Sequence, residues 1–426
     1  WNSNKNHDGV WLFFKSLPRE GQRVYKHINV SNQEHSVISN FKEDNLLLGF
    51  KTPKDGVGLF VYPKSNFRGN VHVSIKIVLD SRSFEGINTR NSALKVYGIE
   101  MVNIPEGKFK VGSPDKTAIS FGGLYKPDKN GGLQNLIAIN SEEQKLKVSI
   151  NGDIYYQAPE GYEGDQTGTI PSSFPKGVNS FYIMKYEPTE GQYIDFLNSL
   201  TPNQKTNRLI FKVENYYNQG GAIIEKNGEF STPFPNKPCQ FMSWDDAMAY
   251  ADWAGLRPMT EFEYVKAARG TVTPIRSDFP WGTDSKDIIQ RRHNNNWELT
   301  MINGWDESNL EDTTKAYFGA SYYWVMDLSG SMWERVITIG HPNGRKFVGL
   351  HGDGILSDNG NATTQNWPTG QENSGGIGFR GGGFYGYDRE YHNYNPYSPI
   401  AFRPYGGWHG GMRSIAYGTR FVRTLD

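Results

Sequence analysis

The sequence predicts an α+β protein in which short strands and long loops outnumber helices. Glycine (48 residues) and aromatic residues (14%) are abundant, while hydrophobic residues make up only 37% of the 426-residue chain. This composition is typical of loops carried on short strands and argues against a helical bundle. Strand-like alternation marks the first hundred residues, and three well-marked helix starts follow later in the chain. The length allows two or three domains with a large core.

Charge and cysteine usage exclude several classes of function. The formal net charge is zero and the pI is about 7.3, which argues against the basic surface of a nucleic-acid-binding protein. Cys239 is the only cysteine, so an internal disulfide and a four-cysteine zinc site are excluded. No apolar run approaches the roughly 18 residues that span a bilayer. No signal peptide is recognised, and Trp1 in place of Met indicates a processed or incomplete amino terminus.

Residues 1–99 are predicted to form a small β-sandwich domain. Positions 71, 73, 75, 77 and 79 are apolar and alternate with mostly polar residues, which buries one face of a strand. Short apolar runs at 10–14 and 59–62 are further strands. We place the domain boundary after residue 99, and residues 100–426 form the second domain. The polar, glycine-punctuated stretch at about 114–170 is expected to be an inserted hairpin region.

Three helices are predicted from their amino-terminal capping residues. Thr189, Ser243 and Thr260 each place a hydroxyl at the cap, and an amide or acid follows three residues later. Such a pair satisfies otherwise unpaired backbone N–H groups in both directions. Helices are therefore expected to follow these three residues, and no regular helix is expected after Gly270.

Residues 327–334 read Asp-Leu-Ser-Gly-Ser-Met-Trp-Glu and have the character of a cation-binding loop. Asp327 and Glu334 flank a tight Ser-Gly turn. Ca²⁺ is bound in this way, by carboxylates at the ends of a loop and by backbone carbonyls between them. The alternative is an ordinary β-turn with a solvated acid on either side.

Seven separated segments, in order, carry a resemblance to one family: Met101–Ser113, Phe181–Leu197, Met242–Gly270, Pro280–Gly282, Asp327–Glu334, Phe379–Gly383 and Tyr417–Arg423. They resemble the signatures of the formylglycine-generating enzyme (sulfatase-modifying factor) family over roughly residues 100–426. The resemblance implies a C-type-lectin-like fold with long loops, a small twisted antiparallel sheet and two main helices. Residues 1–99 resemble the β-rich domain that precedes such modules in some bacterial surface proteins.

The resemblance also bears on catalysis. The family is known for a copper-dependent oxidase whose two copper-binding cysteines lie a few residues after the Arg-Gly-Gly motif. Those positions fall at about Gly386 and Tyr391, and neither is cysteine. Cys239 lies far away and is predicted to be a small core residue. Without paired thiolates, Cu(I) has no soft-ligand site, so we expect no copper and no enzyme activity. Family members that use non-haem iron hold it in a separate helical domain, which we do not recognise here.

One or two structural calcium sites are implied by the resemblance. The family's calcium loop supplies a side-chain oxygen, two backbone carbonyls and a Glu after Trp. The matching positions are Asp327, Gly330, Met332 and Glu334. A second family site uses an Asn and the next carbonyl before a Trp, with a later acid. Asn295 and Asn296 match its first half, and the acid is either Asp306 or Asp312.

Residues 375–411, here called the tail, hold eleven glycines and ten aromatic residues. Tyrosine supplies a large rigid contact area with a polar tip, and Asn and Gly adapt to a partner, as in antibody paratopes. The alternative is that the rings fill a strand-poor core. The resemblance includes diversified receptors whose variable positions lie in this segment. The predicted ligand-binding residues are Tyr385, Tyr387, Asp388, Tyr391, His392, Tyr394, Tyr397, Trp408 and His409.

Other polar segments are better explained as structure. The Asp/Asn/Gly-rich stretches at 351–354 and 358–361 could hold a further cation, but such turns need no metal. His341, His351, His392 and His409 lack the spacing of zinc ligands.

Together these observations predict a non-enzymatic bacterial protein of the cell surface or the extracellular space. Its calcium-stabilised module would bind a protein or glycan through the tail, with no nucleic acid and no direct membrane span. Two alternatives stay open: a structural subunit of a bacterial surface, gliding or secretion assembly, which would form homo-oligomers or larger arrays, and an enzyme with an unrecognised site.

Overall fold

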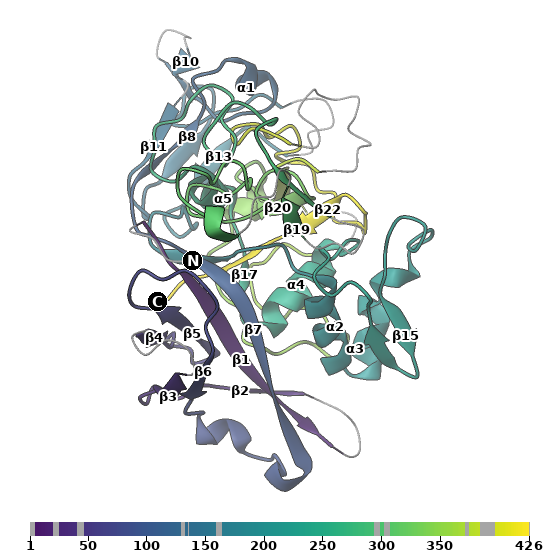
Figure 1. The fold of residues 1–426 in the computed structure, drawn as a ribbon. Coiled ribbons are helices and arrows are strands. Elements are labelled where there is room, and N and C mark those ends of the chain that lie inside the picture. The colour runs from purple at the N-terminus through teal and green to yellow at the C-terminus, as the bar shows by residue number, and fades with distance from the viewer. Residues whose placement is uncertain are drawn as a thin grey trace.

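The computed structural model confirms an α+β fold with long loops (Figure 1). It describes residues 5–19, 25–40, 47–128, 133–134, 136–158, 164–293, 299–301, 307–370, 375–383 and 397–425. Within these residues, no helix is long and apolar enough to cross a membrane.

An eight-stranded sheet runs through the molecule in the order β17-β23-β14-β7-β1-β5-β4, with β2 paired to β1. Its strands are β1 (Asp8–Pro18), β2 (Lys26–Ile28), β4 (Leu48–Lys51), β5 (Gly58–Pro63), β7 (Ser92–Ile104), β14 (Phe181–Met184), β17 (Arg257–Pro258) and β23 (Phe421–Arg423). The long strand β7 pairs with β1 on one side and with β14 on the other. The boundary predicted after residue 99 therefore falls inside a strand, and both predicted domains share one sheet.

The amino-terminal strand β1 is buried on both faces, which explains its continuous apolar run. Trp11 and Phe13 belong to the main core, while Leu12 and Phe14 face a smaller core with Ile28, because successive side chains of a strand point to opposite sides. A two-stranded sheet, β3 (Ser36–Asn40) with β6 (Val73–Lys76), also belongs to this region. Strands β1, β2, β4 and β5 of the predicted sandwich thus continue the central sheet.

The three predicted helices are α2 (Glu190–Ser199), α4 (Trp244–Trp253) and α5 (Glu261–Arg269). Each begins with a complete capping box, at Thr189, Ser243 and Thr260, which confirms the prediction. One helix was not predicted: α3 (Pro202–Arg208) begins with the same device, at Thr201 and Gln204. Its seven residues carry no apolar periodicity, so only the cap signals it. The described residues also form the single helical turns α1 (Thr117–Ser120) and α6 (Pro342–Arg345). The second of these lies after Gly270, where no regular helix was predicted.

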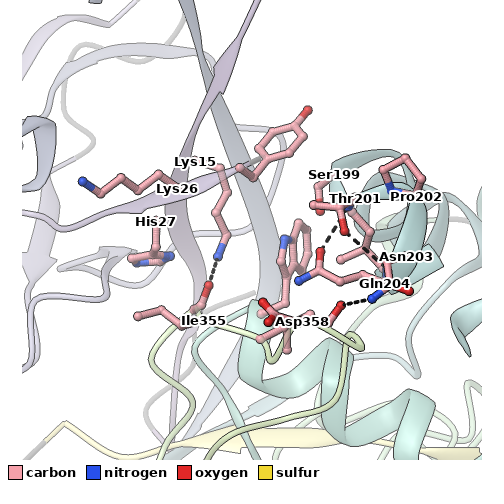
Figure 2. A pocket seen from close by; sticks show the side chains of 15 residues that line it. Lys15, Lys26, His27, Ser199, Thr201, Pro202, Asn203, Gln204, Ile355 and Asp358 are labelled. Atoms are coloured by element: carbon pink, nitrogen blue, oxygen red, sulfur yellow. Dashed lines mark hydrogen bonds between the residues drawn. The ribbon is translucent and has the colours of Figure 1, made fainter. Parts of the chain in front are cut away.

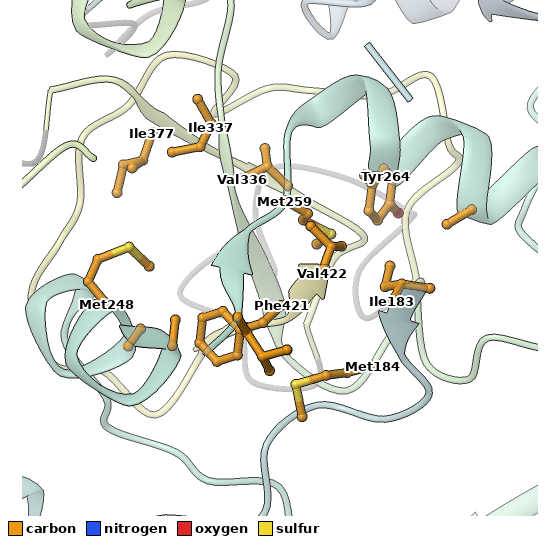
Figure 3. Close-up of a cluster of buried hydrophobic side chains, with 14 of the residues drawn as sticks. Ile183, Met184, Met248, Met259, Tyr264, Val336, Ile337, Ile377, Phe421 and Val422 are labelled. Carbon is orange, nitrogen blue, oxygen red and sulfur yellow. The ribbon is translucent and has the colours of Figure 1, made fainter. Parts of the chain in front are cut away.

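A second, three-stranded sheet carries the carboxyl-terminal motifs. β20 (Trp333–Ile337) lies between β21 (Ile377–Arg380) and β22 (Tyr417–Thr419), antiparallel to the first and parallel to the second. The segments that resemble the family signatures meet in the main core (Figure 3). Its members include Ile183, Met184, Met248, Met259, Tyr264, Val336, Ile337, Ile377, Phe421 and Val422.

Several two-stranded sheets accompany these two larger sheets. In and beside the region of about 114–170, where an inserted hairpin region was predicted, β8 (Phe109–Gly112) pairs with β11 (Leu136–Ile139), β9 (Lys126–Pro127) with β10 (Leu133–Gln134), and β12 (Leu146–Val148) with β13 (Gly168–Ile170). The pairs β15 (Ile224–Lys226) with β16 (Glu229–Ser231) and β18 (Arg291–His293) with β19 (Leu299–Met301) follow.

His351 makes the stability of the carboxyl-terminal strand pH-dependent. Its Nε2 accepts the backbone N–H of Thr424 at 3.0 Å, and burial, with Arg423 and Arg257 nearby, lowers its pKa well below the usual value. The unfolded chain binds a proton at this residue near pH 6.5 and the folded chain does not, so stability is lost as pH falls. The loss begins as the pH falls through the ordinary histidine pKa of about 6.5.

We therefore expect His351→Gln, which keeps an acceptor for Thr424, to lose stability less steeply than the wild type as the pH falls from about 7 to about 5. Urea midpoints at the two pH values measure the difference. His72→Gln, at an exposed histidine, is the control and keeps the wild-type slope. A His351→Gln slope equal to that of the control would contradict this assignment.

Candidate functional site

The predicted cation loop, residues 327–334, is a sharp reversal that leads into β20. Asp327, Gly330 and Ser331 have φ angles of 59°, 92° and 58°, a conformation that residues other than glycine rarely adopt. The carbonyl of Leu328 accepts the Tyr264 hydroxyl at 2.5 Å. The loop is therefore held in a strained shape by the surrounding core.

The described residues of the tail on either side of positions 384–396 lie against this loop. The backbone N–H of Gly330 donates to the Gly381 carbonyl at 3.0 Å. Ser398 donates its N–H to Ser329 Oγ at 3.1 Å and accepts the Ser329 hydroxyl at 3.0 Å. The Tyr397 ring covers Gly330, because a Cβ there would lie 2.4 Å from a ring carbon. The part of the tail between Gly381 and Tyr397 thus begins and ends at the predicted cation loop.

Glu334 is fully buried and forms an ion pair with Arg420, which was not predicted from the sequence. Its Oε1 accepts from Arg420 Nε at 3.0 Å and from Nη2 at 2.7 Å. Arg420 Nη1 also donates to the carbonyls of Met184 and Lys185, at 2.9 and 2.7 Å. The guanidinium thereby ties β20 to β14.

Glu187, 3% exposed, is a second carboxyl group at this place. Its Oε2 accepts the Ser331 hydroxyl at 2.5 Å. Burial first, and the charge of Glu334 second, raise the pKa of Glu187 to about 8. Burial also raises the pKa of Glu334. Two carboxyl groups therefore compete for the one positive charge of Arg420.

Two carboxyl oxygens of this pair, Glu187 Oε1 and Glu334 Oε2, are buried and have no hydrogen-bond partner among the described residues. Unpaired buried carboxylate oxygens are costly, and a hard cation with oxygen ligands would relieve them. The residues present therefore fit a calcium ion near Glu334. Within the described part of the chain, no three His, Cys, Asp or Glu side chains gather as a metal site, so such an ion would depend on backbone carbonyls as well.

The second predicted calcium site lies mostly outside the described residues. Asn295 and Asn296 are not described, nor is Asp306. Asp312 is described, and its Oδ1 accepts the indole N–H of Trp324 at 3.0 Å.

Most of the predicted ligand-binding residues also lie outside the described residues: Tyr385, Tyr387, Asp388, Tyr391, His392 and Tyr394. The remaining three, Tyr397, Trp408 and His409, are half-buried. Tyr397 meets Trp281 edge to face, with ring centroids 5.8 Å apart. The Trp408 ring lies 5.3 Å from that of Phe379. These two rings thus pack against the module while part of each surface stays open to solvent.

Arg335 supports the stretch that carries Trp408. It is fully buried, and the rings of Phe379 and Tyr417 lie 5.7 and 5.3 Å from its guanidinium. Burial lowers its pKa to about 10. Its three backbone partners are the carbonyls of Met242 at 2.9 Å, Met412 at 2.6 Å and Gly410 at 3.3 Å.

Replacing Arg335 with lysine is expected to destabilise the protein by about 3 kcal/mol, because hydrogen bonds from a charged donor are lost and the flat stacking group disappears. The urea midpoint measures this change. Arg276→Lys, at a side chain that is 77% exposed, is the matched control and should shift the midpoint little. Equal midpoints for the two variants would show that Arg335 does not hold this stretch.

Cys239 is fully buried, as predicted for a core residue. Burial raises the pKa of its thiol well above the usual value, which disfavours the thiolate form that metal binding and nucleophilic attack require. The positions that correspond to the family's copper-binding cysteines, about Gly386 and Tyr391, lie outside the described residues.

Comparison with known proteins identifies the same family that the signature segments resemble. Residues 90–425, more than three quarters of the chain, match the family described as "Sulfatase-modifying factor enzyme 1-like domain". A formylglycine-generating enzyme from Thermomonospora curvata is 35% identical over 112 residues, covering 26% of this chain and 36% of that enzyme. A relative from Mus musculus, named inactive C-alpha-formylglycine-generating enzyme 2, is 30% identical over 156 residues, covering 34% of this chain and 48% of the relative.

A formylglycine-generating enzyme from Bos taurus is 25% identical over 213 residues, which are 44% of this chain and 56% of the enzyme. This chain thus spans only part of the length of each of these relatives. The relatives include proteins named formylglycine-generating enzyme and one named as inactive, so the matches alone do not decide catalysis. The family match over most of the chain does establish family membership: the chain belongs to the sulfatase-modifying factor enzyme 1-like family, the family of the formylglycine-generating enzymes.

Proposed function

We propose that this chain is a non-catalytic member of its family, a binding module of the bacterial cell surface or extracellular space. The observation that carries the proposal is that its one cysteine, Cys239, is fully buried. A copper site built on two thiolates cannot form within one chain that holds one cysteine. The existence of a relative named inactive is in keeping with this proposal.

The working surface in this proposal is the tail, and a calcium ion at the loop of Asp327 and Glu334 would hold its base. Two observations support these separate roles for the tail and the loop. Gly381 and Ser398, on either side of the undescribed part of the tail, are hydrogen-bonded to the loop, and two buried carboxyl oxygens beside the loop lack partners among the described residues. Calcium would supply no chemistry beyond charge and coordination. The ligand would be a protein or a glycan, met by the Tyr- and Asn-rich part of the tail.

Catalysis is tested by incubating the protein with copper and a cysteine-containing sulfatase peptide and then probing for an aldehyde with a hydroxylamine reagent. A formylglycine-generating enzyme of the family is the positive control. We expect no aldehyde from the wild type or from Cys239→Ala. Aldehyde formation by the wild type would overturn the non-catalytic assignment.

Binding is tested on glycan and protein arrays with the wild type, a Tyr387→Ala/Tyr391→Ala double variant and the control Tyr217→Ala. Tyr217 is 55% exposed and lies in the loop before β15, outside the tail. A ligand bound by the wild type and the control but lost by the double variant supports the proposal. Self-association without any such ligand would contradict it and favour a subunit of a surface assembly.

A further inference from the structure

A cavity of about 860 Å³ lies between the amino-terminal strands and α3 (Figure 2). Two side chains of α3 on its wall hold the Asp/Asn/Gly-rich turn at 358–361, where a further cation was considered. Asn203 Nδ2 donates to the Asp358 carbonyl at 2.7 Å, and Gln204 Nε2 donates to the Ser357 carbonyl at 3.0 Å. These amides are therefore engaged within the chain, and the outer edge of β7 is a stronger candidate for a binding surface.

The outer edge of β7 is open over residues 92–99. β14 pairs with β7 only from Met101 to Ile104, and the Lys185 N–H adds one hydrogen bond to the Glu100 carbonyl at 3.0 Å. The backbone groups of an antiparallel strand face its two neighbours in alternation. Because Glu100 faces β14, residues 94, 96 and 98 turn their N–H and C=O groups to the same side. No strand among the described residues pairs with them there.

This edge carries apolar side chains and few of the features that keep an edge strand from pairing. Leu94 and Val96 are 47% and 55% exposed, and Val10, 39% exposed, lies on the same face of the sheet. Natural edge strands are usually protected by charges, prolines or bulges. Residues 92–99 contain no proline and a single charge, on Lys95, and their pairing with β1 has no bulge. The edge is therefore suited to accept a further strand, which would bond to its backbone.

A second copy of the same strand fits this edge. With a two-fold axis at Val96, antiparallel pairing places Val96 opposite the partner's Val96 and Leu94 opposite the partner's Gly98. All of these residues turn their backbone groups to the shared edge, so they can exchange hydrogen bonds. Gly98 lies beside two apolar side chains, because a Cβ there would be 3.4 Å from both Leu12 Cδ2 and Val10 Cγ1. The partner's Leu94 would therefore pack over Gly98 against these two side chains.

The other face of the strand favours the same register. Lys95 is exposed and would lie beside the ring of the partner's Tyr97, where the π electrons stabilise an ammonium group. A register centred on Lys95 would instead place two ammonium groups opposite each other, which is destabilising. A register centred on Tyr97 would bring the partner's Leu94 to Glu100, whose carbonyl is already bonded to the Lys185 N–H. The register centred on Val96 avoids both conflicts.

We propose that two copies of this chain form a dimer by antiparallel pairing of residues 92–99 of β7 about a two-fold axis at Val96. The pairing joins the eight-stranded sheets of the two copies into one. A single strand pair buries less surface than the roughly 1,200–2,000 Å² of a stable complex, so the dimer should dissociate with a Kd of about 1–100 µM. The interface uses no residue of the tail, and it is independent of the ligand proposed there.

Disulfide trapping tests the proposed register. Cys239, the one cysteine of the chain, is buried, so a cysteine placed on this edge is the only accessible thiol. In the proposed dimer the two Cα atoms of residue 96 lie about 5.5 Å apart, within reach of a disulfide. Val96→Cys should therefore form a disulfide-linked dimer under mild oxidation, while Ile150→Cys, at a side chain that is 53% exposed, should not. Equal cross-linking of the two variants, including none in either, would overturn the proposal.

Sedimentation velocity measures the association without a covalent link. The wild type should shift from monomer to dimer as its concentration rises through the micromolar range. Val96→Lys places two ammonium groups at the axis and should weaken the dimer at least about tenfold, whereas Ile150→Lys should keep the wild-type association. Melting temperatures check that both variants stay folded. A wild type that stays monomeric throughout the micromolar range, or a dimer that Val96→Lys leaves intact, would overturn the proposal.

Discussion

Replacing Asp246 with alanine is expected to destabilise the protein by about 3–5 kcal/mol, the cost of breaking a buried ion pair from one side. Asp246 is fully buried. Its carboxylate accepts from Arg208 Nη1 at 3.0 Å and from Arg413 Nε at 2.7 Å. It also caps α4 by accepting the Ser243 N–H at 2.9 Å. The substitution leaves two arginines without their shared partner and removes half of a capping box.

Chemical denaturation compares Asp246→Ala with Asp246→Asn and with Asp284→Ala. The asparagine keeps an acceptor for the cap and loses the charge, so it should fall between the alanine variant and the wild type. Asp284 is exposed, and its replacement should change stability by no more than about 0.5 kcal/mol. An Asp246→Ala midpoint close to that of the control would show that the two arginines are satisfied in another way.

Replacing Glu334 with glutamine is expected to have an effect of similar size, about 3–5 kcal/mol, because Arg420 then keeps a buried charge without its carboxylate. The same change removes a ligand of the proposed calcium site. Asp327→Ala separates the two causes, because Arg420 pairs with Glu334 and not with Asp327. Urea midpoints with calcium and with EDTA therefore distinguish them.

We expect Glu334→Gln to be less stable than the wild type in both solutions. Asp327→Ala should lose less stability than Glu334→Gln in EDTA, and it should gain less stability from calcium than the wild type does. If the Asp327 variant gains as much stability from calcium as the wild type does, Asp327 is not a ligand of the calcium ion. Equal stability of Glu334→Gln and the wild type in EDTA would contradict the structural role of the Arg420 pair.

Features that depend on local sequence could be predicted, and those that depend on distant segments could not. The caps at Thr189, Ser243 and Thr260 are local signals, and all three helices exist. The turn at 327–334 is also local. In contrast, β7 continues past residue 99 because it finds partners on both sides, β1 and β14. A domain boundary inferred from composition cannot take that strand pairing into account.

The same limit applies to the candidate site. Glu187, Glu334 and Arg420 come together from three segments, and in the sequence Glu187 appears only as the residue before a proline and a helix cap. Sequence reasoning also places arginine on the surface, whereas the largest fully buried side chains include Arg335, Arg403 and Arg420. Each of these finds its carbonyls or carboxylates in distant parts of the chain.

Calcium titration of protein freed of metal by EDTA tests the central claim most directly, namely that the loop from Asp327 to Glu334 holds a cation at the base of the tail. Calorimetry should show saturable binding that Asp327→Ala loses at one site, and the melting temperature of the wild type should rise with calcium. At a concentration of 100 times Kd the gain is about 2.7 kcal/mol. No heat of binding and no shift in melting temperature would contradict the claim and leave residues 327–334 as an ordinary turn.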